Sequence, residues 1–176
     1  MPAAQALCAA TRRRLQCQIG ENAAMTATPC TEAGFAEPLL CLAVVEQIAD
    51  AVIFADREGV IRIWNRAAET LFGFSAIEVV GRSLDIIVPE RFRQAHWAGF
   101  HRAIESGKTT GAGAVRTTKA THKAGHTFYV DLSFGLVRDA SGVVIGSTAM
   151  GRDCTARFNA EKELRARLAK FETKGI

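Results

Sequence analysis

The stretch DAVIFADREGVIRIWNRAAETLFGFSAIEVVGRSLDIIVPERFR, residues 50–93, decides the fold. Apolar residues alternate with their neighbours at Val52 and Phe54, and again at Ile61 and Ile63, with the turn sequence DREG between the two runs. Alternation around a turn that contains an acidic residue and a glycine is typical of a β-hairpin. The residues therefore predict two short antiparallel strands, each with its apolar pair on one face.

Helix signals follow this hairpin directly. Asn65 is a preferred N-cap residue, and Gly73 is of the type that ends helices. We therefore expect a short helix at residues 66–72, then further short helices up to the Val-Pro pair at residues 88–89.

The whole segment resembles the PAS domain, a cytosolic sensory fold. The residues from Asp50 to Pro89 follow the family pattern aDaVi..D..G.I...N.aae.lfGys..E.vG.s...l.P. The resemblance covers about residues 38–157 and implies an α+β fold, the PAS fold. It implies a five-stranded antiparallel sheet of order 2-1-5-4-3, covered on one face by helices and available to partners on the other, with flanking N- and C-terminal helices.

Composition limits the class of protein. The 176 residues, 48% hydrophobic content and net charge of +4 fit one globular domain with tails, and this mild charge is weak evidence for nucleic-acid binding. No apolar run approaches the roughly 20 residues of a membrane span. The 5 cysteines form no Cys-x-x-Cys pair, which favours a reducing compartment. We therefore expect a cytoplasmic protein that contacts neither nucleic acid nor membrane directly.

The chain outside the quoted stretch divides into three parts. Residues 1–36 are rich in Ala and Thr and are expected to be disordered, with Met25 as an alternative natural start. Residues 37–155 are the expected PAS domain, in which residues 37–49 form a leading helix. Residues 156–176 are expected to form most of a charged helix that resembles the signalling connectors of other PAS proteins.

Periodicity predicts the remaining elements of the domain. Apolar residues four apart indicate a long helix over residues 90–105, which Gly107 ends. Strands are expected at residues 113–121, 126–137 and 143–153, with Ala-Gly and Ser-Gly turns between them.

Catalytic and photochemical functions lack their characteristic residues. The sequence has no phosphate-binding glycine loop and no nucleophile elbow, so we expect no enzymatic activity. Light-sensing PAS domains carry a reactive cysteine in a Gly-Arg-x-Cys motif, but the matching residues 81–84 read GRSL. A flavin–cysteine photocycle is therefore not expected, whereas noncovalent FAD binding stays open.

A motif on the long helix indicates haem. It resembles that of the haem-binding, oxygen-sensing PAS domains of the FixL type, whose long helix carries the pattern P-E-x-x-R-x-x-H. Residues 89–96 read PERFRQAH and match it position by position. The resemblance implies haem b as cofactor and His96 as its metal ligand, between Phe92 and Phe100 on the apolar face of the helix.

The same resemblance extends to the sheet side of the pocket. Those sensors use an arginine nine residues before a turn glycine to hydrogen-bond bound oxygen, and Arg116 lies nine residues before Gly125. The pocket-lining positions of the adjacent strand correspond to Val130, Leu132 and Phe134.

Other interpretations of these residues remain open. A histidine in an apolar stripe such as His96 is also found as a hydrogen-bonded core residue. Phe134 is larger than the usual aliphatic residue and would crowd the gas site. Ala114 stands where one haem-binding branch has an axial methionine, so five-coordinate iron is expected. Structural or surface roles are expected for the other histidines, His101, His122 and His126.

The resemblance therefore implies a cytoplasmic sensory module in signal transduction or transcriptional regulation. Its implied partners are a second copy in a homodimer, a separate histidine kinase or transcriptional regulator, and a gas such as oxygen. Gas binding would move the haem and Arg116, shift the sheet and alter the packing of the flanking helices. The alternative is a ligand-free PAS module for protein interaction and dimerisation.

Overall fold

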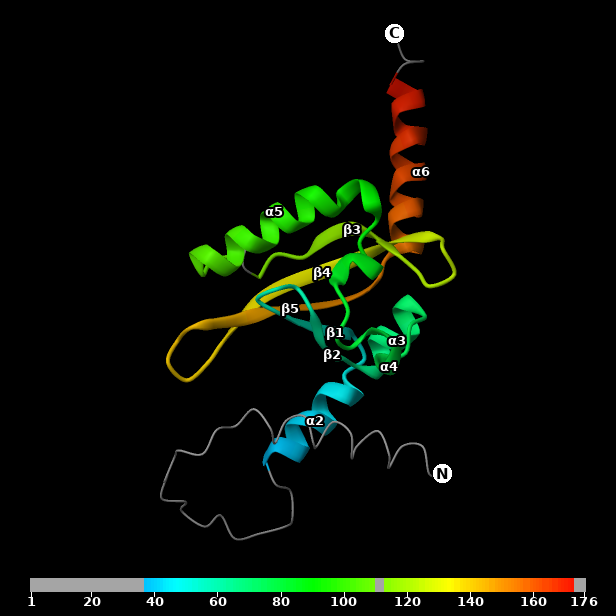
Figure 1. Cartoon of the computed structure of the whole chain (residues 1–176). Coiled ribbons are helices and arrows are strands. Elements are labelled where there is room, and N and C mark those ends of the chain that lie inside the picture. Colours follow the sequence, from blue (N-terminus) through cyan, green and yellow to red (C-terminus); the bar gives the residue numbers. More distant parts are fainter. Residues whose placement is uncertain (1–36, 110–112, 173–176) are drawn as a thin grey trace, which may run out of the picture. The chain divides into compact units, whose positions relative to one another are not determined.

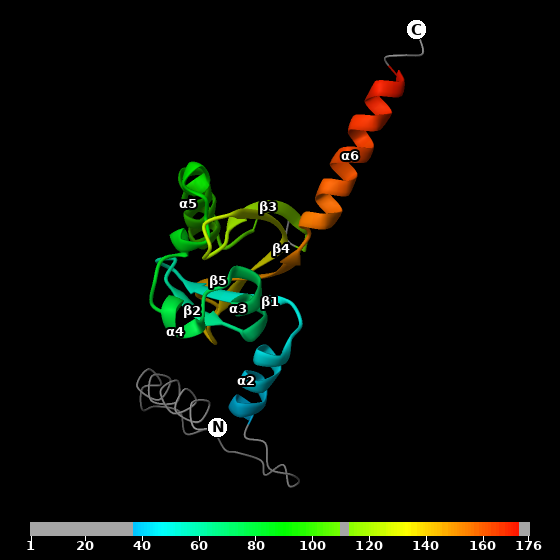
Figure 2. The same cartoon turned by 90° about the vertical axis from the view of Figure 1, so that its right-hand side faces the viewer.

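The computed structural model describes residues 37–109 and 113–172 (Figures 1 and 2). The elements in chain order are α2 (Glu37–Gln47), β1 (Ala51–Asp56), β2 (Ile61–Trp64), α3 (Arg66–Phe72), α4 (Ala76–Val79), the 3-10 helix η1 (Leu84–Ile86), α5 (Glu90–Ser106), β3 (Arg116–Thr121), β4 (Thr127–Arg138), β5 (Val144–Asp153) and α6 (Thr155–Glu172). The expected extension, residues 1–36 with Met25, lies outside the described residues. None of the helices in the described segments is long and apolar enough to cross a membrane.

The five strands form one antiparallel sheet of order β2-β1-β5-β4-β3, which confirms the predicted α+β fold and strand order. The last strand, β5, lies at the centre and pairs with β1 on one side and β4 on the other. Helices α3, α4 and α5 lie on one face of this sheet (Figures 1 and 2).

The side chains of the first hairpin do not alternate between the two faces of the sheet as the sequence pattern predicted. Ile61 is buried, but Ile63 is 41% exposed and Trp64 is buried in its place. The reason is a β-bulge, because the pairing between β1 and β2 shifts register between Phe54 and Ala55. The predicted alternation through Ile61 and Ile63 is therefore wrong, since these two side chains lie on opposite faces.

The core forms between the helices and the inner face of the sheet. From β1 it uses Ala51, Ile53 and Ala55, which alternate along the strand with Val52 and Phe54. Its largest members are aromatic: the ring of Phe72 lies 5.1 Å from Trp64 and 5.6 Å from Phe128, between centroids. Phe72 on α3 thereby contacts residues of β2 and β4, which lie on either side of the central pair β1 and β5.

Asn65 joins three elements through one buried amide. As predicted, it caps α3: its Oδ1 accepts from the N–H of Ala68 at 2.9 Å, and also from that of Val52 on β1 at 2.9 Å. Its Nδ2 donates to the carbonyls of Val45 on α2 and Asp50, each at 3.0 Å. Because Asn65 is fully buried, water cannot replace any of these bonds.

Replacing Asn65 with Ala should therefore destabilise the protein strongly. The variant leaves two N–H groups and two carbonyls without their partner, which should lower the free energy of unfolding by about 3 kcal/mol or more. Urea unfolding followed by circular dichroism measures this loss. Thr70→Ala on the exposed face of α3 is the control, with an expected change within about 0.5 kcal/mol. Equal small losses in both variants would contradict the role of Asn65.

Candidate functional site

A cavity of about 380 Å³ lies between α5 and the inner face of the sheet. Such a volume falls in the range of small-molecule pockets. Its lining is mostly apolar and comes from α3, α5, the segment before α5 and four strands: Ile53, Ala55, Phe72, Leu84, Ile87, Val88, Phe92, Ala95, His96, Phe100, Arg116, Thr118, Lys119, Ala120, Leu132, Phe134, Ser147 and Ala149.

Small side chains on the central strands leave room for this cavity. Ser147 and Ala149 of β5 belong to its wall, and Ala55 of β1 pairs with Ser147. Ala149 lies between the larger Ile53 and Phe134 of the neighbouring strands. The sequence interpretation missed these small residues. The sequence does contain a signal for them. Small residues stand at alternate positions of the last strand, and alternate residues of a strand point to the same face.

His96 lies on the helix wall of the cavity. It is half-buried, and its ring contacts those of Trp97 and Phe100, with centroids 5.1 Å and 6.2 Å away. Burial lowers the pKa of His96 below the ordinary histidine value; the nearby Asp85 carboxylate partly opposes this effect. The ring nitrogen Nδ1 is buried and has no hydrogen-bond partner in the described part of the chain. The neutral form of the His96 imidazole is therefore favoured, and its Nδ1 lacks the partner that buried polar atoms usually have.

The two predicted phenylalanines border His96 on the same helix. Phe100 is half-buried and packs against the core cluster. Phe92 is 39% exposed, and the guanidinium of Arg91 lies over its ring at 4.6 Å from the centroid. The apolar stripe therefore runs from the core at Phe100 to the rim of the cavity at Phe92.

Arg116 belongs to the opposite, sheet-side wall. It begins β3, where it is exposed and pairs with Leu132 of β4. Leu132 and Phe134 line the cavity beside it, whereas Val130 is fully buried in the core and is absent from the lining. All the predicted site residues except Val130 thus border one cavity.

The other histidines lie away from this cavity wall. His101 is exposed and stacks on Trp97, with ring centroids 5.7 Å apart. His122 and His126 stack on each other at 4.5 Å in the β3–β4 hairpin. Within residues 37–109 and 113–172, no three His, Cys, Asp or Glu side chains form a group that could hold a metal ion.

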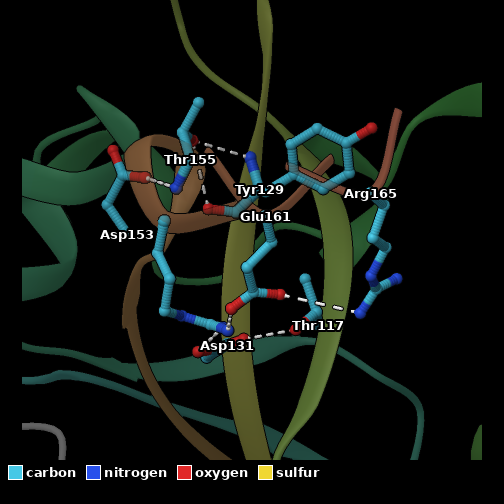
Figure 3. A network of polar contacts seen from close by, with 8 residues as sticks. Thr117, Tyr129, Asp131, Asp153, Thr155, Glu161 and Arg165 are labelled. Carbon is cyan, nitrogen blue, oxygen red and sulfur yellow. Dashed lines mark hydrogen bonds and ion pairs between the residues drawn. The ribbon is translucent and has the colours of Figure 1, made fainter. Parts of the chain in front are cut away.

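A polar network joins the other face of β3 and β4 to α6 (Figure 3). Asp131 of β4 accepts hydrogen bonds from Thr117 of β3 at 2.5 Å and from Arg157 of α6 at 2.6 Å. Both hydrogen bonds lower the pKa of Asp131, and the bond from Thr117 has the larger effect. Arg157 also donates to Glu161 at 2.7 Å, and Glu161 lies 3.9 Å from Arg165.

Tyr129 strengthens the same junction. Its backbone N–H donates to Oγ1 of Thr155 at 2.9 Å, and its ring stacks on Phe158 of α6 at 3.7 Å between centroids. Successive strand residues point to opposite faces of a sheet. Thr117 and Asp131 thus face α6, while their chain neighbours Arg116 and Leu132 face the cavity.

Comparison with known proteins identifies the family. A family model described as the PAS fold matches residues 40–154. The sensor protein FixL of Bradyrhizobium diazoefficiens is 32% identical over 123 residues, which are 69% of this chain and 24% of FixL. The oxygen sensor protein DosP of Escherichia coli is 27% identical over 133 residues, which are 76% of this chain and 16% of DosP. The chain thus spans about a quarter or less of these relatives.

Solved structures show the same fold. An RNA-binding light-oxygen-voltage receptor superimposes with a TM-score of 0.63 at 22% identity, covering 85% of this chain and 42% of that one. The PAS domain of a protein from Colwellia psychrerythraea gives 0.60 at 19% identity, covering 69% and 99%. The chain belongs to the PAS-fold family, whose members are typically sensory, non-catalytic domains of signalling and regulatory proteins.

Acid should destabilise the protein through His96. Because its pKa is lowered by burial in the folded state, the unfolded chain takes up this proton at a higher pH than the folded one. The free energy of unfolding should therefore fall as the pH drops below about 6.5, the pKa of an unperturbed histidine. Urea unfolding of haem-free protein at about pH 7 and about pH 5.5 measures this loss.

The matched variants are His96→Phe, which should lose less stability between the two pH values, and His126→Phe in the β3–β4 hairpin, an exposed histidine whose loss should leave the result as in the unmodified protein. An equal loss in all three proteins would contradict the assignment to His96.

Proposed function

We propose that this PAS domain is a haem-dependent gas sensor, with His96 as the iron ligand and Arg116 as the hydrogen-bond donor to bound oxygen. The observation that carries the proposal is the state of His96, a neutral imidazole with an unpartnered buried nitrogen on the wall of an apolar cavity. Haem iron requires a neutral imidazole nitrogen, and the lowered pKa of His96 favours the neutral form. The similarity to a sensor protein and an oxygen sensor supports the same function.

The residues of the cavity fit haem in chemistry. Phe92, Phe100, Leu132 and Phe134 supply apolar and aromatic surface, and the small residues of β5 leave space beneath α5. When bound, haem b would supply the iron at which a gas binds reversibly. The protein's part is to exclude water from that centre with these side chains and to hold the imidazole of His96 in place.

Arg116 would provide selectivity among gases. A guanidinium is permanently charged and has five N–H donors, so it favours a ligand that carries partial negative charge over an apolar one. Its place on the sheet wall, across the cavity from α5, supports this role. Arg116 would act only as a hydrogen-bond donor.

The proposed output passes through β3 and β4 to α6. These two strands border the cavity with Arg116 and Leu132 and hold α6 with Thr117 and Asp131. A change in the cavity that moves either strand therefore reaches the start of α6. Signalling in this way needs two states whose balance the ligand shifts. The proposed setting is the cytoplasm, as a homodimer that controls a separate histidine kinase or transcriptional regulator.

A second candidate is a ligand-free module for protein interaction and dimerisation. Its support is the apolar surface of α2, where Leu40 is 46% and Val44 is 52% exposed, with Leu39 and Leu42 beside them. Exposed apolar surface of this kind marks a contact with another chain. Both candidates involve such a contact, so cofactor binding is what separates them.

An absorption spectrum tests the haem proposal. Protein expressed with added haem should show a strong Soret band that shifts with oxygen or carbon monoxide, and His96→Ala should lose it. His101→Ala, an exposed histidine on the same helix, should keep the band. Absence of a Soret band in the unmodified protein after reconstitution would leave the interaction module as the function, and a full band in His96→Ala would remove the ligand assignment.

A separate experiment tests the proposed role of Arg116. Arg116→Ala should retain haem but release oxygen about tenfold faster or more, because it loses a charge-assisted hydrogen bond. Stopped-flow measurement of oxygen release tests this prediction. Carbon monoxide release is the control and should change less, since that ligand carries less negative charge. Equal changes for the two gases would argue against a hydrogen bond from Arg116.

The junction with α6 also yields a prediction. Arg157→Ala removes the ion pairs to Asp131 and Glu161, so the first turns of α6 should exchange their amide hydrogens about five- to tenfold faster. Hydrogen exchange with mass spectrometry measures the change. Arg167→Ala breaks only the exposed pair with Glu163, 3.7 Å apart, and is the control. Similar protection of the first turns in both variants would disprove the anchoring role of Arg157.

A further inference from the structure

Polar contacts to η1 hold α5 beside His96. The indole Nε1 of Trp97, the next residue on α5, donates to Oδ1 of Asp85 at 2.8 Å. One turn earlier, Arg93 donates from Nη2 to the backbone carbonyl of Asp85 at 3.0 Å and from Nε to that of Val88 at 3.3 Å. Arg93 Nε also lies 3.7 Å from the Asp85 carboxylate. Asp85 thus contacts two residues of α5, Arg93 and Trp97, one before and one after His96 in the sequence.

Trp97 also contacts the turn between β1 and β2. A Cβ atom added to Gly59 would lie 2.3 Å from the Trp97 ring, so the indole occupies the space that only glycine leaves open. Gly59 has a positive φ of 76° and accepts a backbone hydrogen bond from Leu84 at 3.1 Å. The indole therefore rests on the turn while its N–H is held by Asp85.

These contacts matter because a cavity lies under α5. A helix on a filled core is positioned by close packing, but here part of the surface beneath His96 is open space. His96 and Trp97 are consecutive and their rings meet edge to face at 5.1 Å between centroids. A displacement of Trp97 would therefore move the imidazole.

We propose that Asp85 is the positioning residue for His96, acting through the Trp97 indole and Arg93 to set where α5 places the imidazole on the cavity wall. This inference rests on the proposed function, because the imidazole that Asp85 positions is the one proposed to bind iron. Asp85 itself contacts α5 and has no part in ligand binding.

Nuclear magnetic resonance of haem-free protein tests the contact directly. The protein has two tryptophans, so two indole N–H signals are expected, and Trp64, which donates to the carbonyl of Phe74 at 3.1 Å, is an internal control. Asp85→Ala should shift the Trp97 indole signal, raise its hydrogen-exchange rate about tenfold and shift the His96 ring signals. The Trp64 signal should stay in place.

Three variants separate positioning from a general loss of structure. Asp85→Asn keeps a carbonyl that can accept from Trp97, so it should restore most of the indole protection. Trp97→Phe keeps a ring on Gly59 but removes the donor, and it should shift the His96 ring signals as Asp85→Ala does. Gln94→Ala, an exposed residue of α5, should leave both signals unchanged. Unchanged Trp97 or His96 signals in Asp85→Ala would overturn the proposal.

Haem loss provides the second readout. With apomyoglobin in excess as haem acceptor, Asp85→Ala should lose haem about tenfold faster than the unmodified protein, and Asp85→Asn should lie between them. Equal rates in all three would overturn the positioning role even if the indole bond exists. If the unmodified protein binds no haem, the proposed function fails, and the His96 ring signals of the haem-free variants then decide whether Asp85 positions the imidazole.

Discussion

The central strand of the sheet carries small side chains toward α5, and the rest of the site depends on this constraint. Ser147 and Ala149 do not fill the space beneath the helix, so a cavity remains where most domains of this size have a packed core. The helix above must then be held from outside that space. The contacts of Asp85 with Trp97 and Arg93 do so.

The alternation of strand residues also connects the cavity on one face of the sheet to α6 on the other. Where β3 pairs with β4 at their cavity end, neighbouring residues face opposite sides of the sheet. Arg116 and Thr117 form one such pair, and Leu132 and Asp131 form the other. Because Thr117 is bonded to Asp131 and Asp131 is bonded to Arg157 of α6, the register between the two strands connects the cavity to the helix. This connection needs no additional residues between the two sites.

Local signals predicted much of this structure, whereas long-range pairing was beyond them. Asn65 and Gly73 mark the ends of α3 because capping depends on neighbouring residues. The strand order followed only from the family resemblance. The bulge after Phe54 depends on how two strands pair, so the alternation at Ile63 gave the wrong face. Asp85 and Trp97 are 12 residues apart in the chain, and no spacing rule pairs a carboxylate with an indole across a loop.

The buried, unpartnered nitrogen of His96 bears on the choice between the two candidate functions. A buried nitrogen without a partner costs about 1–3 kcal/mol, and a well-packed apolar side chain at this position would avoid that cost. A module that worked only through its exposed surfaces, such as α2, would gain nothing from such a group inside a cavity. On the haem proposal, the lowered pKa of His96 favours the neutral form of the imidazole, which iron binding requires. Under the same proposal, the stability lost at His96 would be the cost of a binding site, and the polar contacts around Asp85 would keep that site in position.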